Sequence, residues 1–160
     1  MKIAIISDVH DNTPYLRSFF AAEKFAVLLI CGDVGNIDTI NLIAELFSGK
    51  IYFVFGNADT FDKKDIPKNI INLGESGIIE LDHKKIGLCH EPRKIVETRH
   101  GVSLLKQKPQ IIFYGHTHKP WLEEKENVLL INPGSLGQTP STYAVWDTGR
   151  ATPELIRTEI

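Results

Sequence analysis

The chain has 160 residues, of which 42% are hydrophobic and 24% are charged, and its formal net charge is −2 at pH 7. This length and balance fit a single domain, residues 1–160, with one sizeable core. The small net charge excludes broad attraction to nucleic acids or to anionic membranes, and no apolar run is long enough to span a bilayer. Two cysteines, Cys31 and Cys89, are too few for a disulfide framework. Because the first predicted strand starts at Lys2 and leaves no room for a signal peptide, we expect a reduced, cytoplasmic protein.

The first half of the chain alternates predicted strands and helices. One helix follows Thr13-Pro14, which offers an N-cap and a first-turn proline, and it runs to about Lys24. A second helix is predicted from about Asp38 to Ser48, where apolar residues recur at i, i+3, i+4 and i+7. This alternating order predicts a parallel sheet with right-handed crossovers. The strands are Lys2–Ser7, Ala26–Cys31 and Ile51–Phe55.

The second half is richer in predicted strands than in helices. Two hairpins are predicted, with turns at Asp82-His83 and at Glu126-Asn127. A weaker helix is predicted between Glu97 and Lys108. Together with the parallel sheet of the first half, these strands predict an α/β fold in which two packed sheets are flanked by helices. The strands of this half are Gly77–Leu81, Lys84–Cys89, Gln110–Tyr114, Trp121–Lys125, Val128–Asn132, Tyr143–Asp147 and Glu154–Glu159.

Side chains that can bind metal ions follow five of these strands, at the point where each strand ends. Strand ends on one edge of an open α/β sheet form the crevice where ligands bind, so we expect these side chains to converge. In Asp8-Val9-His10 the two donors share one face of an extended chain and can hold one ion. Mixed nitrogen and oxygen donors suit Mn²⁺, Fe, Ni²⁺, Co²⁺ or Zn²⁺. The candidate metal ligands are Asp8, His10, Asp33, Asn57, His90, His116 and His118.

Each of these motifs has a more ordinary explanation when it is taken alone. A single Asp-x-His pair more often caps a loop, and Gly-Asp and Gly-Asn are common turn sequences. His90 alone fits a hydrogen-bonded core histidine. For Asn12, the sequence leaves open a contact to a phosphate oxygen or a helix cap. The prediction of a metal centre therefore rests on the coincidence of all the candidate ligands at matching strand ends.

In this order, the motifs resemble those of the calcineurin-like metallophosphoesterase superfamily. The short chain and the segment Asn132-Pro133-Gly134-Ser135 resemble its small bacterial and archaeal phosphodiesterase branch. The resemblance runs from residue 1 to about residue 147. It implies a four-layer αββα fold, that is, a two-sheet sandwich flanked by helices. The matching motifs are Asp8-Val9-His10, Gly32-Asp33, Gly56-Asn57, His90 and Gly115-His116-Thr117-His118.

The resemblance also implies two divalent metal ions, and manganese is the metal that we expect at both positions. Asp33 would bridge the two ions, and Asn57 and His90 would act with it in catalysis. One ion would be held by Asp8, His10, Asp33 and His118, and the other by Asp33, Asn57, His90 and His116.

The expected chemistry follows from the charge of such a centre. Asp8, Asp33 and a bridging hydroxide do not neutralise two divalent ions, so the centre stays positive and favours an anionic phosphate ester. We expect attack by the bridging hydroxide on a small phosphodiester, with no broad nucleic-acid binding and no membrane partner. Many family members carry a histidine directly after the Gly-Asn pair as the general acid, where this chain has Ala58. The absence of this histidine favours activated diesters over ordinary monoesters as substrates.

The alternative function is that of a non-catalytic scaffold that binds partner proteins. One retromer subunit resembles this family in its fold and has lost part of the metal set. The presence of all the ligand positions in this chain favours the enzyme, although a fold alone does not determine a function.

Overall fold

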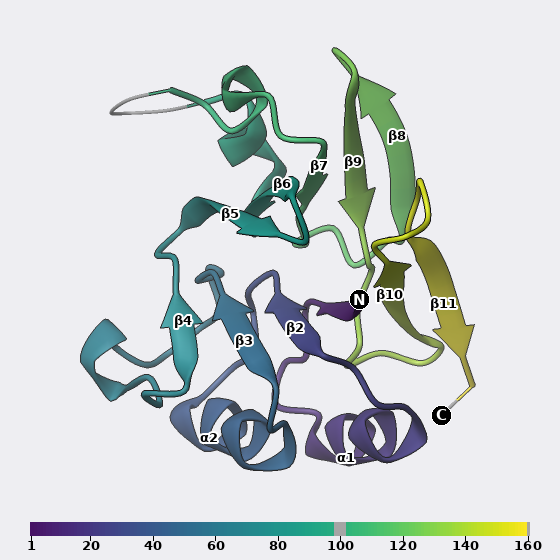
Figure 1. The fold of residues 1–160 in the computed structure, drawn as a ribbon. Coiled ribbons are helices and arrows are strands. Elements are labelled where there is room, and N and C mark those ends of the chain that lie inside the picture. The colour runs from purple at the N-terminus through teal and green to yellow at the C-terminus, as the bar shows by residue number, and fades with distance from the viewer. Residues whose placement is uncertain (98–101, 160) are drawn as a thin grey trace.

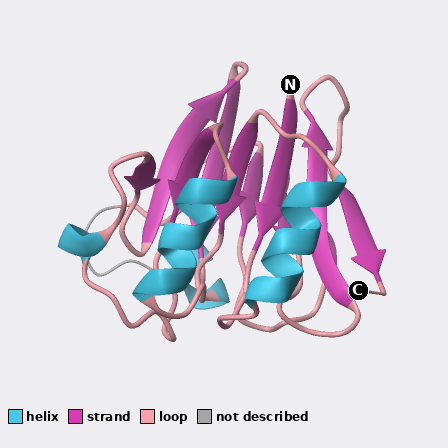
Figure 2. Cartoon of the chain, turned by 90° about the horizontal axis from the view of Figure 1, so that it is seen from below, coloured by secondary structure: helices cyan, strands magenta, loops and turns pink. Residues whose placement is uncertain are grey.

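Two facing sheets form the centre of the structure, a computed structural model that describes residues 1–97 and 102–159. In that part of the chain, sheet A has the strand order β11-β10-β1-β2-β3-β4 and sheet B the order β5-β6-β7-β9-β8. The helices α1 (Thr13–Ala22) and α2 (Ile37–Leu46) both lie below sheet A in Figure 1, while sheet B lies above it. Figure 2 shows the two helices side by side across the strands of that sheet.

Sheet A contains the predicted strand–helix alternation. Its strands β1 to β4 run parallel, and β10 and β11 continue the sheet in antiparallel fashion beyond β1. Both faces of the central strands are covered, so these strands are continuous apolar runs in the sequence. The bounds are β1 Lys2–Ile6, β2 Val27–Ile30, β3 Lys50–Phe53, β4 Ile70–Asn72, β10 Ser141–Asp147 and β11 Glu154–Thr158.

Sheet B contains both predicted hairpins, β5–β6 and β8–β9, around a parallel centre formed by β6, β7 and β9. The two residues of each turn, Asp82-His83 and Glu126-Asn127, have positive φ angles, as a two-residue hairpin turn of type I′ requires. The bounds are β5 Ser76–Leu81, β6 Lys84–Cys89, β7 Ile111–Phe113, β8 Trp121–Lys125 and β9 Val128–Asn132.

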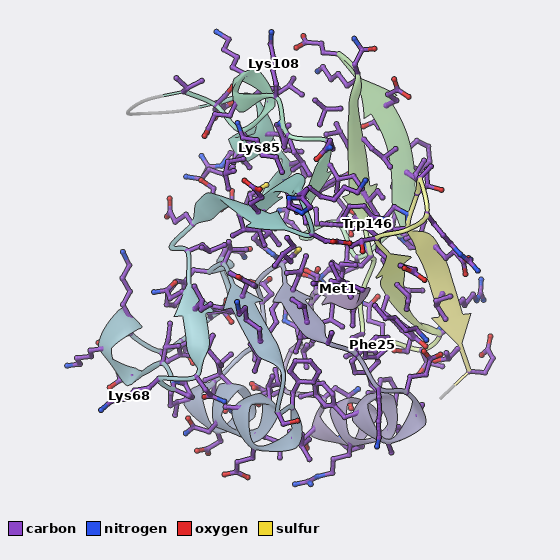
Figure 3. All side chains as sticks on the ribbon, in the orientation of Figure 1. Met1, Phe25, Lys68, Lys85, Lys108 and Trp146 are labelled. Atoms are coloured by element: carbon purple, nitrogen blue, oxygen red, sulfur yellow. The ribbon has the colours of Figure 1, made fainter. Side chains whose placement is uncertain are left out.

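The core consists of apolar layers on both faces of sheet A and on the outer face of sheet B. Along β1, Ala4 and Ile6 face the helices, whereas Ile3 and Ile5 face sheet B, because successive side chains of a strand point to opposite faces. Trp146, labelled in Figure 3, lies in the layer between the sheets. In the described residues, the outer face of sheet B is covered by short 3-10 helices, at Pro92–Ile95 and Leu105–Gln107, rather than by α-helices.

The structure differs from the sequence-based expectations at three places. The sequence analysis did not predict β4, which has only three residues at the edge of sheet A. Asn12, rather than Thr13, occupies the N-cap of α1, and its side chain makes no capping hydrogen bond. Part of the helix predicted between Glu97 and Lys108 falls on residues 98–101, outside the described residues, and the rest contains only a 3-10 helix. Pro109 disfavours helical backbone at Lys108, whose φ is 52°.

Among the described residues, no helix has the length and apolar character needed to cross a membrane.

Candidate metal centre

The predicted ligands lie on the loops that follow β1, β2, β3, β6 and β7. Parallel strands of one sheet end at the same edge, so these loops are neighbours. Backbone hydrogen bonds join them beyond the strands: the Asp8 N–H donates to the Gly32 carbonyl (3.1 Å), and the Gly115 N–H donates to the His90 carbonyl (3.0 Å). The structure brings all the predicted ligand side chains together at one end of the two-sheet sandwich.

A first group of donor atoms is formed by Asp8, His10 and His118. The Nε2 atom of His118 lies 3.1 Å from Asp8 Oδ1 and 3.1 Å from His10 Nε2. His10 Nε2 is also 3.6 Å from Asp8 Oδ1 and 3.7 Å from Asp33 Oδ2. Asp8 is buried, whereas His10 is exposed and His118 is half-buried. The group therefore opens to solvent through its histidines.

A second group contains Asp33, Asn57, His90 and His116. His90 Nε2 lies 3.2 Å from Asp33 Oδ2 and 3.0 Å from Asn57 Oδ1. His116 Nδ1 lies 3.1 Å from Asn57 Oδ1 and 3.3 Å from His90 Nε2. Asp33 Oδ2 thus approaches a histidine nitrogen of each group, which is the position expected of a bridging carboxylate. Asp8 also lies close to this group, within 4.8 Å of Asp33 and His90 by their ligand atoms.

The arrangement of these atoms is more favourable with a cation between them than without one. Asp8 Oδ1 is buried and has no hydrogen-bond partner among the residues that the structure describes, a state that costs about 1–3 kcal/mol when nothing compensates it. The Nδ1–H of His90 donates to the Cys31 carbonyl (2.7 Å), so in the neutral ring the lone pair of Nε2 faces the oxygens of Asp33 and Asn57. Acceptor atoms that face one another repel, and a divalent ion between them replaces repulsion with attraction. The donor set is therefore chemically suited to metal ions.

The pKa values of two buried groups reflect this crowding. Burial lowers the pKa of His90, but hydrogen bonds with Asp33 and the Cys31 carbonyl and the nearby carboxylate charges outweigh burial, so the pKa is raised. Burial raises the pKa of Asp33, but hydrogen bonds from His90 and from the Ala58 N–H outweigh it, so the pKa is lowered. Asp33 therefore stays ionised, and a proton on His90 Nε2 occupies the place that a metal ion would take.

The backbone of the centre is strained at most of the candidate ligands. Five of them have positive φ angles between 47° and 73°, which L-residues other than glycine rarely adopt. Each such residue costs about 1–3 kcal/mol, and this kind of strain collects at functional sites. The loops also approach closely, because a Cβ on Gly56 would collide with the Asp33 carboxylate. The five strained ligands are Asp8, His10, Asp33, His116 and His118.

The chain matches a known protein family over most of its length. Residues 1–151 match the pattern of the calcineurin-like phosphoesterase superfamily domain. The chain belongs to the calcineurin-like phosphoesterase superfamily.

Relatives within and around this superfamily agree with the assignment. A phosphodiesterase of Methanocaldococcus jannaschii is 29% identical over 143 residues, which cover 84% of this chain and 83% of that protein. A solved structure of a novel archaeal phosphodiesterase has a TM-score of 0.82 and 26% identity, and covers 98% of this chain and 99% of its own. Vacuolar protein sorting-associated protein 29 of Schizosaccharomyces pombe is 27% identical over an aligned length of 176 residues, gaps included. The alignment covers 100% of this chain and 85% of that protein. The predicted family and the predicted two-sheet fold are confirmed.

Asp59 is a residue of this calcineurin-like phosphoesterase domain that the sequence analysis did not place in the site. Its carboxylate accepts hydrogen bonds from the backbone N–H groups of Asp33 (3.0 Å), Gly35 (3.0 Å) and Gly56 (2.7 Å). It thereby ties the loop after β2 to the loop after β3 and sets the distance between Asp33 and Asn57. Burial raises the pKa of Asp59, although the three N–H donors act against burial. Its only sequence signal is its position two residues after Asn57.

The Asp8 carboxylate is oriented by neighbours in sequence and in space. Ser7 Oγ donates to Asp8 Oδ2 (2.6 Å), and the backbone N–H of His116 donates to the same oxygen (3.1 Å). This leaves Oδ1 facing the histidines. Asn12, for which the sequence left two roles open, instead donates its side-chain N–H to the Gly137 carbonyl (2.8 Å), so it holds a loop beside the centre.

Gln138 contacts the outer edge of a candidate ligand. Its side-chain amide nitrogen, Nε2, lies 2.7 Å from Nδ1 of His118, the ring nitrogen opposite the one that faces Asp8, so in this orientation the amide N–H donates to the ring. A histidine that binds metal through Nε2 carries its proton on Nδ1 and needs an acceptor there, which the Gln138 amide supplies when it rotates by about 180° and brings its oxygen to Nδ1. Gln138 lies 20 residues further along the chain than His118, and no local pattern connects the two.

Proposed function

We propose that this protein is a metal-dependent phosphodiesterase whose centre holds two divalent ions. The observation that carries the proposal is the convergence of the candidate ligands into two neighbouring groups, with Asp33 Oδ2 3.7 Å from His10 Nε2 of one and 3.2 Å from His90 Nε2 of the other. Ions bound there would lower the pKa of water, supply hydroxide near neutral pH and attract the phosphoryl oxygens. The first ion would be held by Asp8, His10, Asp33 and His118, and the second by Asp33, Asn57, His90 and His116.

The residues of the chain orient this centre and control access to it. Asp8, Asp33 and His90 are buried and form its floor, where their hydrogen bonds hold the donor atoms in place. Asn57 and His116 are exposed, so a small phosphate ester reaches the centre directly from solvent. The substrate class is proposed to be phosphodiesters, in keeping with the archaeal phosphodiesterases to which the chain is similar.

The test is hydrolysis of bis(4-nitrophenyl) phosphate by protein that has been stripped with a chelator and then reloaded. We expect activity to disappear on stripping and to return with Mn²⁺, with Ni²⁺, Co²⁺ and Zn²⁺ compared in parallel. Asp8→Asn should remain inactive after reloading, whereas Asp65→Asn, at an exposed position in a 3-10 helix, should behave as the unmodified protein. If no metal restores hydrolysis, the proposal is wrong.

A second candidate function, a protein-binding scaffold, is supported by the similarity to vacuolar protein sorting-associated protein 29. The edge strand β8 exposes Trp121 and Leu122, with 57% and 43% of their surface accessible. A scaffold would show no hydrolysis with any metal, so the same experiment separates the two functions.

Metal binding is expected to weaken as the pH falls. A histidine must lose its proton to bind a metal ion, and its ordinary pKa is about 6.5. Because the pKa of His90 is raised, protons start to compete with metal above that value. Titration of stripped protein with Zn²⁺ at several pH values should show the apparent affinity falling from neutral pH downward, with the activity following. Full occupancy retained below about pH 5 would contradict four histidine ligands.

The contribution of His90 to the stability of the metal-free protein should depend on pH in the opposite sense to metal affinity, so it should be higher at low pH than at high pH. A raised pKa of His90 in the folded state stabilises the fold below the ordinary pKa of histidine, and this contribution is lost as the pH rises through the raised value. Thermal melts of stripped and loaded protein across the same pH range distinguish the two effects.

Gln138→Leu is expected to weaken metal binding about tenfold, the lower end of the 10–100-fold range for partners of metal-bound histidines, since Gln138 is exposed. The leucine keeps the approximate size of the side chain and removes the amide whose oxygen would accept from His118 Nδ1 in the metal-bound state. Gln138→Glu keeps an acceptor and should retain most of the affinity. Calorimetric titration with Zn²⁺ measures both. Equal affinity in the leucine variant and the unmodified protein would show that Gln138 does not orient His118.

A further inference from the structure

A side hollow of about 210 Å³ opens directly beside the candidate metal centre. It lies between the loop that leads into β8 of sheet B and the edge strand β11 of sheet A, which are neighbours on the right of Figure 1. The residues that define it for the argument below are His118, Pro120, Gln138, Pro140, Leu155 and Arg157.

The hollow is continuous with the centre through His118 and Gln138. His118 presents Nε2 to Asp8 and Nδ1 to Gln138, so the two residues form the partition between the centre and the hollow. A phosphate ester held by an ion bound at His118 Nε2 would therefore be separated from the side hollow by about the width of one imidazole ring. This continuity distinguishes it from a larger hollow of about 320 Å³ near Lys2, Glu23 and Arg150, which shares no residue with the metal centre.

The walls of the side hollow are suited to a flat ring. Pro120 and Pro140 offer rigid apolar faces, and Leu155 is an exposed leucine on the face of β11 that Arg157 shares. The Arg157 side chain is 70% accessible, and a guanidinium plane can stack on an aromatic ring. A cavity of about 150 Å³ takes up benzene, so about 210 Å³ has room for one ring and no more than that.

We propose that the side hollow binds an uncharged aromatic ring, carried as one ester group of the substrate. The proposal rests on the proposed phosphodiesterase function and narrows its substrate class to phosphodiesters with a single-ring aryl substituent. The apolar walls favour the ring, and the metal centre holds the phosphate to which it is attached. An exposed leucine at the rim, otherwise unexplained, then has a role in substrate choice.

The test compares the binding of phenylphosphonate and methylphosphonate to Zn²⁺-loaded protein by calorimetry, at a pH where both are fully ionised. Neither has an ester bond to hydrolyse, so the measurement does not depend on catalysis. We expect phenylphosphonate to bind about tenfold more tightly, in line with the burial of a large part of one ring. Leu155→Asp should reduce this preference to about twofold or less, because the ring meets the new charge, while repulsion of the phosphonate group affects both ligands and cancels in the ratio of their affinities.

Ile71→Asp is the matched control. Ile71 lies on β4, the opposite edge strand of the same sheet, and is 41% accessible against 37% for Leu155. This variant should keep the full preference for the ring. Equal binding of the two phosphonates by the unmodified protein, or an undiminished preference in Leu155→Asp, would overturn the inference.

The outcome can be separated from that of the proposed function. If bis(4-nitrophenyl) phosphate is hydrolysed but the ring preference is absent, only the ring site is wrong. If the preference is present and depends on Leu155 while no diester is hydrolysed with any metal, the ring site stands and the catalytic proposal falls.

Discussion

Asp33→Asn is expected to weaken metal binding at both positions by more than about 100-fold and to abolish hydrolysis. The loss of an outer partner of a metal-bound histidine costs 10–100-fold in affinity, and a carboxylate shared by two ions should matter more. Asparagine has nearly the shape of aspartate and can still accept the Ala58 N–H at Oδ1, a bond of 2.8 Å in the structure. The fold should therefore survive, and only the bridging charge is lost.

Elemental analysis of metal-loaded protein provides the measurement. The unmodified chain should approach two equivalents of metal, Asp33→Asn close to none, and Asn57→Ala about one, because Asn57 contacts only the second group. Thermal melts of the stripped proteins check that each variant is folded. A plateau at one equivalent or fewer in the unmodified protein, or two equivalents in Asp33→Asn, would refute the shared carboxylate.

An aryl phosphodiester should be hydrolysed faster than an alkyl phosphomonoester, by about 10²–10⁴-fold in kcat/KM, the contribution that a general acid makes when it is present. The leaving oxygen needs a proton unless it departs as a stable anion such as nitrophenolate. Ala58 has only a methyl group at the position where the family resemblance leads us to expect a histidine, and its backbone N–H is already donated to Asp33. Asp59 cannot take over this role easily, since its carboxylate accepts three backbone N–H groups.

Bis(4-nitrophenyl) phosphate and glycerol 2-phosphate are suitable substrates for this comparison. Ala58→His should narrow the gap between them if the new side chain reaches the leaving oxygen. Ala58→Gln is its control, because glutamine is similar in reach but has no proton that titrates near neutral pH. A clear preference of the unmodified protein for the monoester would show that another group protonates the leaving oxygen.

The positions of most strands and of the ligands can be predicted from the sequence because both depend on local patterns. The buried runs before Asp8 and Asp33 are apolar on both faces, and the chain must turn where they end. Parallel strands place those ends at one edge of each sheet, so convergence of the donors within a sheet follows from topology, whereas the meeting of the two edges depends on how the sheets pack. The short strand β4 was not predicted, because three residues carry too little periodicity to be recognised without their partner strand.

The local pattern of the sequence therefore determined the family, the two-sheet fold and the identity of the candidate ligands. Only the tertiary structure decided which atom of each ligand faces the centre, because that depends on hydrogen bonds across long sequence separations. The Cys31 carbonyl selects Nε2 of His90, Asp59 joins two loops, and Gln138 reaches His118 from a different loop. The side hollow likewise forms only where β11 of one sheet meets the loop before β8 of the other, a contact between distant segments that no local periodicity encodes.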